Sequence, residues 1–192
     1  MNQMQIMREF HKKETAHAGF SLTELMTVIA VLGIMVAIAV PGFIKWLPDC
    51  YLKSAARDLR ASFQLARITA IKTGANCTIT FNQTVDSDTC DGDPCDYVVF
   101  QDEDNDLVLD SSETTVKGVK WADYHASIST DSNTFTNNDD GLPAVAFRSN
   151  GIPRNSAGGF GGGTVSIKNS DNSEADIELS NAGNIRIELT IH

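Results

Sequence analysis

Residues 17–43 read HAGFSLTELMTVIAVLGIMVAIAVPGF, and this apolar stretch decides how the chain begins its fold. Its central part, Phe20–Val40, carries a single charge, Glu24. A helix of that length rises about 31 Å, roughly the thickness of the hydrocarbon layer of a bilayer. Because basic residues before such a span keep the N-terminus in the cytoplasm, the pattern predicts a membrane helix with the remaining chain outside. The basic residues here are Arg8, Lys12 and Lys13.

Three interpretations of this stretch compete. A secretory signal peptide would be cleaved after the small residues of Ala37–Ala39, but its apolar core would be shorter and uncharged. A plain signal anchor would hold a periplasmic binding domain at the membrane. Neither explains Glu24, because a carboxylate at membrane depth costs about 2.5–3.5 kcal/mol. The third interpretation therefore starts from the residues around Glu24.

Residues 19–43, GFSLTELMTVIAVLGIMVAIAVPGF, resemble the N-terminus of type IV pilins and type II secretion pseudopilins. The resemblance implies that residues 1–19 are a leader, removed by prepilin peptidase between Gly19 and Phe20, and that Phe20 is then N-methylated. Glu24 corresponds to the assembly glutamate of this family, and Pro41 to the proline at which its helix softens.

The resemblance also implies partners and a location. In a fibre, Glu24 would meet the new Phe20 amine of a neighbouring subunit, and such a buried pair sets register more than it adds stability. The alternative is that Glu24 only reaches the lipid headgroups. The chain would be a single-pass protein of the bacterial inner membrane that later joins other major and minor pilins or pseudopilins.

Past Pro48 the apolar residues recur at helical spacing, which predicts an amphipathic helix from about Pro48 to Thr73 with Gly74 as its C-cap. The resulting division is a leader (1–19), a transmembrane and assembly helix (20–44), an amphipathic helix (45–74) and a β-rich periplasmic domain (75–192). The apolar stripe of the amphipathic helix is Leu52, Ala56, Leu59, Phe63, Ala66 and Ala70.

The remaining chain reads as six or seven strands, with a tight hairpin at Asn181–Gly183. One long helix followed by strands predicts an α+β fold, in which the helix packs on an antiparallel sheet as in pilins. The glycine-rich stretch 156–164 is expected to be a mobile surface loop, since it lacks the residues of a phosphate loop.

Three later segments narrow the resemblance to the GspH/FimT branch of minor subunits, which prime or cap a fibre. They are AARDLRASFQLARITAIKTGANCTITF, AFRSNGIPRN and IELSNAGNIRI. This branch implies a minor pilin or pseudopilin, a structural subunit at or near the tip of a type IV pilus or a type II secretion pseudopilus.

The acidic stretch DEDNDLVLDSSE, residues 102–113, matches several positions of a calcium-binding loop. The template requires glycine where this chain has Leu107, and it requires flanking helices where the flanks here read as strands. We therefore weigh a calcium site against an acidic hairpin turn, which is the favoured interpretation. The candidate ligands are Asp102, Asp104, Asp106, Asp110 and Glu113.

All four cysteines follow the apolar stretch, which fits an oxidising compartment. Cys90 and Cys95 flank a turn-forming run and lie close enough in sequence for a local disulfide. A Cys50–Cys77 bridge would be strained by the helix between them unless that helix ends early, and the alternative is that both are buried thiols. Paired short spacings typical of zinc sites do not occur.

The formal net charge of −10 argues against general binding of nucleic acid. Some FimT-type proteins bind DNA through a Gly-Arg-x-Arg motif, but here Asn184 replaces the first arginine. A DNA-uptake role is thus kept as an alternative, resting on Arg186, Arg148 and Arg154. We expect no enzyme, because the chain has no nucleophile–base pair and no nucleotide loop, and no cofactor apart from the calcium considered above.

Overall fold

The computed structural model describes residues 19–85, 90, 94–125 and 127–192. The expected leader therefore lies outside the described residues, apart from Gly19. The chain divides into two compact units, Met1–Gly42 and Phe43–His192.

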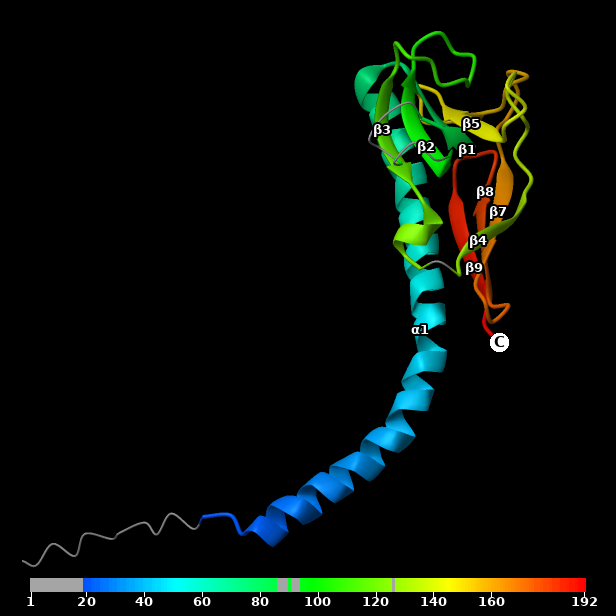
Figure 1. Ribbon diagram of the computed structural model, residues 1–192. Helices are drawn as coiled ribbons and strands as arrows, with labels where there is room; N and C mark the ends of the chain where they lie inside the picture. Colours follow the sequence, from blue (N-terminus) through cyan, green and yellow to red (C-terminus); the bar gives the residue numbers. More distant parts are fainter. Residues whose placement is uncertain (1–18, 86–89, 91–93, 126) are drawn as a thin grey trace, which may run out of the picture. The chain divides into compact units, whose positions relative to one another are not determined.

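Helix α1, Leu22–Thr73, begins in the first unit and ends in the second, and its assignment is unbroken at Pro41 (Figure 1). The C-terminus of α1 is capped as predicted, because Gly74 has a φ of +75° and its N–H donates to the Ala70 carbonyl at 3.0 Å.

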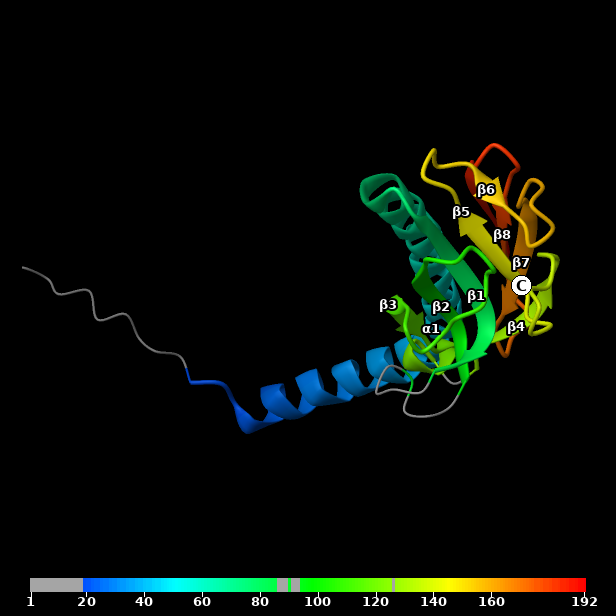
Figure 2. The same cartoon turned by 90° about the horizontal axis from the view of Figure 1, so that it is seen from above.

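The second unit contains two antiparallel sheets (Figures 1 and 2). The first has the order β3-β2-β1-β5-β6 and the second the order β4-β7-β8-β9. The predicted α+β architecture, one long helix followed by antiparallel strands, is confirmed. The strands are β1 Asn76–Thr84, β2 Pro94–Asp102, β3 Thr114–Val119, β4 Ser129–Asn133, β5 Ala144–Phe147, β6 Pro153–Arg154, β7 Gly163–Lys168, β8 Glu174–Leu179 and β9 Ile185–Thr190, with a 3-10 turn at Trp121–Asp123.

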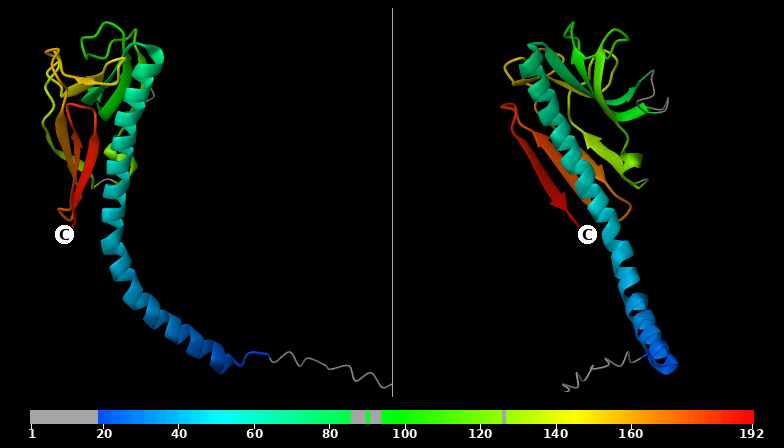
Figure 3. Two further views of the ribbon diagram at one scale, coloured as in Figure 1. Left: turned by 180° about the vertical axis from the view of Figure 1, so that it is seen from behind. Right: turned by 90° about the vertical axis from the view of Figure 1, so that its left-hand side faces the viewer.

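The C-terminal half of α1 packs against both sheets (Figure 3). The predicted apolar stripe is buried throughout, and it shares one core with the inward side chains of both sheets. Aromatic rings fill the centre: Phe63 of α1 contacts both Phe81 and Phe135, which stack on each other, and Tyr97 connects Phe81 with Trp121. The amphipathic pattern therefore determines which face of the helix the sheets cover.

The described residues form nine strands, which is more than the six or seven expected. β3, β4 and β6 were not predicted. β4 (STDSN) is almost entirely polar and lies at a sheet edge, and β6 has only two residues, so neither carries an apolar alternation. β3 is bulged against β2 between Val99 and Phe100, which interrupts the regular register.

A polar cluster joins α1 to the first sheet. Lys117 on β3 and Tyr97 on β2 both donate to Oδ2 of Asp58, at 2.5 and 2.7 Å. Lys117 also donates to Ser62 Oγ at 3.1 Å. Burial alone would raise the pKa of Asp58, but the hydrogen bonds from Lys117, Tyr97 and Tyr124 outweigh it and lower that pKa.

This cluster makes the stability of the fold depend on pH. The pKa of Asp58 is lower in the folded chain than its ordinary value of 3.8, so its contribution is complete above that value and is lost as the pH falls through the folded pKa. We expect Asp58→Asn to lower the free energy of unfolding by about 1–2 kcal/mol at pH 7, and by less below pH 3.8. Urea unfolding of both chains in detergent at the two pH values measures this. A difference that does not change with pH would contradict it.

Candidate assembly site

The predicted processing residues lie at the start of α1. Gly19 and Phe20 precede Ser21, and the helix begins at Leu22. The Ser21 hydroxyl accepts the backbone N–H of Glu24 at 3.3 Å, so Ser21 acts as the N-cap. Sequence reasoning overlooked this role, although Ser21 and Glu24 have the S-x-x-E spacing of a capping box.

Glu24 is exposed in the first turn of α1, where the helix dipole favours a negative charge. Within the described part of the chain, no cationic side chain pairs with its carboxylate. The surrounding side chains are apolar and also exposed; Phe20 is 79% and Leu22 73% accessible. The carboxylate of the isolated chain therefore has neither a partner nor a buried environment.

α1 is, among the described residues, the one helix long and apolar enough to cross a membrane. None of its most apolar stretch is buried by the rest of the chain. Removing apolar surface from water is favourable at about 25 cal/mol per Å². This segment is therefore expected to be covered by lipid or by other helices.

The predicted calcium ligands lie in the connection between β2 and β3. One carboxylate oxygen from each of Asp102, Asp104 and Asp106 lies within 4.8 Å of the others, while Asp110 and Glu113 do not belong to this group. The structure thus brings three of the five predicted residues together.

The buried carboxylate of this group already has partners. Asp102 is fully buried, and its two oxygens accept hydrogen bonds from the Thr78 hydroxyl at 2.8 Å and the Asn105 N–H at 2.7 Å. Asp106 accepts the Val108 N–H at 2.7 Å. These bonds fold the loop back on itself, as in other turns capped by aspartate.

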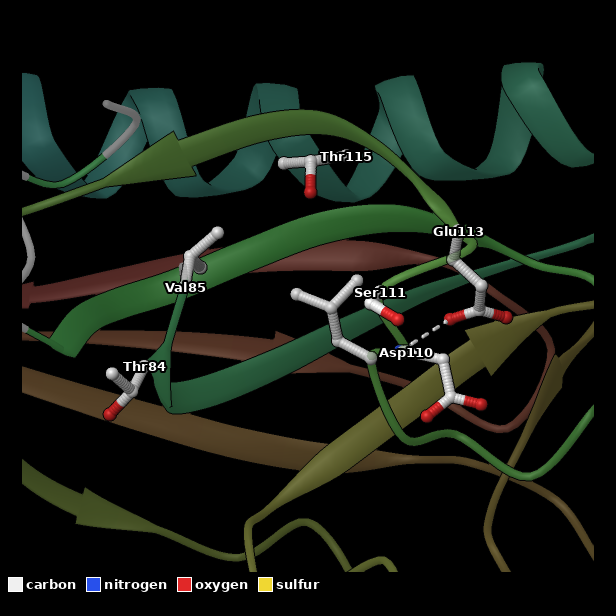
Figure 4. Close-up of a pocket in the computed structure, with 7 residues that line it drawn as sticks. Thr84, Val85, Asp110, Ser111, Glu113 and Thr115 are labelled. Atoms are coloured by element: carbon white, nitrogen blue, oxygen red, sulfur yellow. Dashed lines mark hydrogen bonds between the residues drawn. The ribbon is translucent and has the colours of Figure 1, made fainter. Parts of the chain in front are cut away.

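Glu113 closes the same loop from its far end. Its carboxylate accepts the N–H of Glu103 at 2.9 Å and that of Asp110 at 3.1 Å, the second of which is drawn in Figure 4. Burial, together with the nearby charges of Asp102 and Asp104, raises the pKa of Glu113 despite these hydrogen bonds. The calcium-loop template assigns the Glu113 carboxylate to the metal, but here this carboxylate accepts hydrogen bonds from backbone amides.

Leu107 stands where the calcium-loop template has glycine, and its backbone adopts the left-handed conformation that the glycine would take, with φ of +67°. Its side chain is fully buried with Ala144 and Ala146. The bend of the template is therefore present, but it serves to insert an apolar side chain into a small core.

Cys90 and Cys95 form a disulfide, the pairing predicted from their spacing. Cys50 and Cys77 are free thiols, and Cys50 is only half-buried. Cys77 is fully buried, and this burial raises the pKa of its thiol to about 12. A thiol with so high a pKa is inert at neutral pH.

Comparison with known families now places the chain. Residues 55–183, about two thirds of its length, match the family described as type II transport protein GspH. The chain belongs to the GspH family. Residues 15–40 match the prokaryotic N-terminal methylation motif, which covers Gly19, Phe20 and Glu24. The description of the GspH family connects its members with type II transport.

Individual relatives share less with this GspH chain. The type IV major pilin PilA of Myxococcus xanthus is 44% identical over 45 residues, which are 23% of this chain. The match spans about a fifth of the length of that pilin. The minor pilin FimU of Pseudomonas aeruginosa is 18% identical, with a TM-score of 0.46 over 71% of this chain and 87% of FimU. The minor pseudopilin EpsH of Vibrio cholerae is 15% identical, with a TM-score of 0.43 over 72% of this chain and 96% of EpsH.

Arg186 on β9, one of the arginines on which the DNA-uptake alternative rests, lies among acidic side chains. Arg186 pairs in register with Glu178 on β8. Together with Asp176 and Glu188, these residues line a hollow of about 140 Å³. A phosphate approaching Arg186 would meet three carboxylates.

The other two arginines donate to main-chain carbonyls. Arg148 binds the Gly158 carbonyl at 2.7 Å, and Arg154 binds the Asn105 carbonyl at 2.9 Å. Both side chains therefore hold loops in place, a role that sequence reasoning did not assign to them.

These surroundings predict weak binding of nucleic acid. In titrations of double-stranded DNA into the full chain in detergent, we expect no salt-dependent binding between 50 and 200 mM salt. The reason is that net acidic surfaces repel phosphates. The Arg186→Ala variant should behave like the wild type. A steep salt dependence that this variant loses would support the uptake receptor instead.

Proposed function

We propose that this GspH chain is a minor pilin or pseudopilin, made as a precursor in the bacterial inner membrane with its leader in the cytoplasm and its β-rich domain in the periplasm. The observation that carries the proposal is the methylation motif at residues 15–40, which leads directly into a helix with unburied apolar side chains. Neither a signal peptide nor a plain anchor requires that motif.

Prepilin peptidase would cleave between Gly19 and Phe20, and Phe20 would then be N-methylated. The capped first turn of α1 holds Glu24 one helical turn from the new amine end, ready for the amine of a neighbouring subunit. Membership of the GspH family supports a place at or near the tip of a type IV pilus or a type II secretion pseudopilus, where the subunit helps to prime assembly.

Mass spectrometry of the mature N-terminus tests the proposal. We expect N-methylated Phe20 in cells that have prepilin peptidase, and Met1 in cells that lack it. An N-terminus at Val40 would support a signal peptide, and one at Met1 in both cells would support a plain signal anchor. Either result would exclude the pilin function.

We further infer that the loop at residues 102–113 is an acidic turn and not a calcium site, because the carboxylates of Asp102, Asp106 and Glu113 already accept backbone amides. Calorimetric titration of calcium should therefore give equal heats for the wild type and for Asp104→Asn. Asp104 is exposed, so this change should leave the fold intact. A binding heat that disappears in Asp104→Asn would establish the metal site.

A further inference from the structure

Four consecutive residues of α1 come just before the part of the helix that the β-rich unit covers. Phe43, Ile44, Lys45 and Trp46 are all exposed, and burial by the rest of the chain begins at Leu47. The ring of Phe43 is 58% accessible and that of Trp46 55%. Large apolar side chains in water are unfavourable, so this segment needs a cover that the isolated chain does not provide.

The side chains of this segment are those found where a membrane meets water. Phe43 and Trp46 are neighbours on the helix surface, with ring centroids 6.0 Å apart. Lys45 lies between them in sequence, and it forms no ion pair within the described residues. Tryptophan is enriched at the level of the lipid headgroups, and lysine can lay its stem on apolar surface while its ammonium stays in water. Residues 43–46 are called the interfacial collar.

The length of the apolar span places the collar at one edge of the lipid. A helix needs about 20 residues to cross the hydrocarbon layer of a bilayer. Counted from Leu22, where α1 begins, that length ends near Pro41. Lys45 is the first charged residue after Glu24. The collar therefore follows directly where the chain leaves the hydrocarbon.

A polar turn limits how far the lipid chains can reach along α1. Asp49 is buried, and its Oδ1 accepts a hydrogen bond from the side-chain amide of Asn169 at 3.0 Å. The turn between β7 and β8 that begins there exposes the polar residues 170–172. The backbone N–H of His192 donates to Ser173 Oγ at 3.1 Å, so the C-terminus lies beside the same turn (Figure 1). Burying such groups in hydrocarbon is costly, so the lipid chains must end before residue 49.

We propose that the interfacial collar binds the phospholipid headgroup layer on the side of the membrane that the β-rich unit occupies. The rings of Phe43 and Trp46 lie at the edge of the hydrocarbon, and the ammonium of Lys45 points to the lipid phosphates. The collar thereby fixes the depth of α1 and keeps the polar turn beside Asp49 just outside the lipid. The inference rests on the proposed function for the insertion of α1 into a membrane.

The charge of the chain determines which part of the collar carries the binding. The net charge of −10 gives the chain no general attraction to anionic lipids, and Asp171 in the polar turn adds a further negative charge near the surface. One lysine contributes only a small, salt-dependent attraction. Burial of the two aromatic rings must therefore dominate, and the position of the collar should change little with salt.

Fluorescence quenching of the full chain in vesicles of phosphatidylethanolamine and phosphatidylglycerol tests the proposal. One set of vesicles carries a nitroxide in the headgroup layer, and the other carries it at the ends of the acyl chains. The headgroup nitroxide should quench Trp46 at least about threefold more, because its ring would lie roughly 15 Å from the bilayer centre. Trp46→Phe is the control: it keeps an aromatic ring, and its remaining tryptophan, Trp121, is buried in the β-rich unit and should respond to neither nitroxide.

Thiol labelling tests whether the collar fixes the depth of the helix. In a Cys50→Ser background, Val40→Cys places a thiol below the collar, while the remaining cysteines are buried or in the disulfide. A charged maleimide, added to both sides of the vesicles, should label it slowly. Phe43→Gln with Trp46→Gln should let α1 slide outward and raise the labelling rate about fivefold. Ile68→Gln with Ile71→Gln changes two exposed apolar residues farther along α1 and should leave the rate unchanged.

Three outcomes would overturn the inference. Quenching of Trp46 mainly from the chain ends would place it inside the hydrocarbon, and quenching from neither position would mean that water or another protein covers it. An unchanged labelling rate in the Phe43→Gln, Trp46→Gln chain would exclude a role in setting depth. N-terminal mass spectrometry of the chain, purified from cells with prepilin peptidase, separates these failures from that of the proposed function. A chain that begins at N-methylated Phe20 but fails these tests contradicts the collar alone, whereas an unprocessed chain contradicts the pilin function.

Discussion

Replacing Phe63 by alanine is expected to lower the free energy of unfolding of the Phe43–His192 unit by about 3–5 kcal/mol. Phe63 is fully buried on α1, and its ring centroid lies 6.5 Å from that of Phe81 and 5.9 Å from that of Phe135. Phe81 belongs to β1 of the first sheet, and Phe135 follows β4 of the second. One ring thus joins the helix to both sheets, and its removal leaves a cavity that rigid neighbours fill only in part.

Urea unfolding of the full chain in detergent, followed by the fluorescence of the buried Trp121, measures this change. Gln64→Ala is the matched control, since Gln64 is the next residue on α1 and is exposed. The control should change the free energy of unfolding by less than about 0.5 kcal/mol. Because small domains are stable by only about 5–15 kcal/mol, Phe63→Ala should also lower the amount of folded protein in cells. Equal effects of the two substitutions would refute this account of the core.

The elements that could be predicted from sequence are those with a local signal. The period of 3.6 identified the buried stripe of α1, and glycine at positive φ marked its end at Gly74 and the β8–β9 hairpin at Gly183. The N-terminal methylation motif was likewise predictable, because it lies within a few consecutive positions and does not depend on the rest of the fold.

Contacts between distant segments had no such signal. Asp58 and Lys117 are 59 residues apart, and Asp49 binds Asn169 across 120 residues, at 3.0 Å. Each side chain alone reads as an ordinary surface charge or amide. These contacts form only because the topology brings β3 and the β7–β8 turn against α1, where the side chains then hold the helix in place.

The glycine-rich stretch 156–164 was also misjudged in part. It was predicted as a mobile surface loop, but its last glycines pack against the fold. A Cβ on Gly161 would lie 2.5 Å from the backbone of Arg154, and one on Gly163 would lie 2.6 Å from Phe135. Glycine is needed there for close approach of the backbone, and composition alone cannot distinguish that need from flexibility.

Glu24→Ala is expected to reduce incorporation into fibres on the order of tenfold or more, while membrane insertion and cleavage stay intact. Insertion should become easier, since the carboxylate costs about 2.5–3.5 kcal/mol at membrane depth. Assembly should fail, because an amine buried in the fibre without its partner is strongly unfavourable, by about 3–5 kcal/mol. Immunoblots of sheared fibres and membranes, with the N-terminal mass of the membrane pool, separate the two steps.

Two control variants separate the charge of Glu24 from its place in the helix cap. Glu24→Gln keeps the shape of the side chain without its charge, and it should assemble as poorly as Glu24→Ala. Ser21→Ala removes the hydroxyl that caps α1 but keeps the carboxylate, and it should assemble almost normally because the cap contributes only about 1 kcal/mol. If Glu24→Ala entered fibres as well as the wild type, the carboxylate would only reach the headgroups, and the Phe20 amine would have to find another partner.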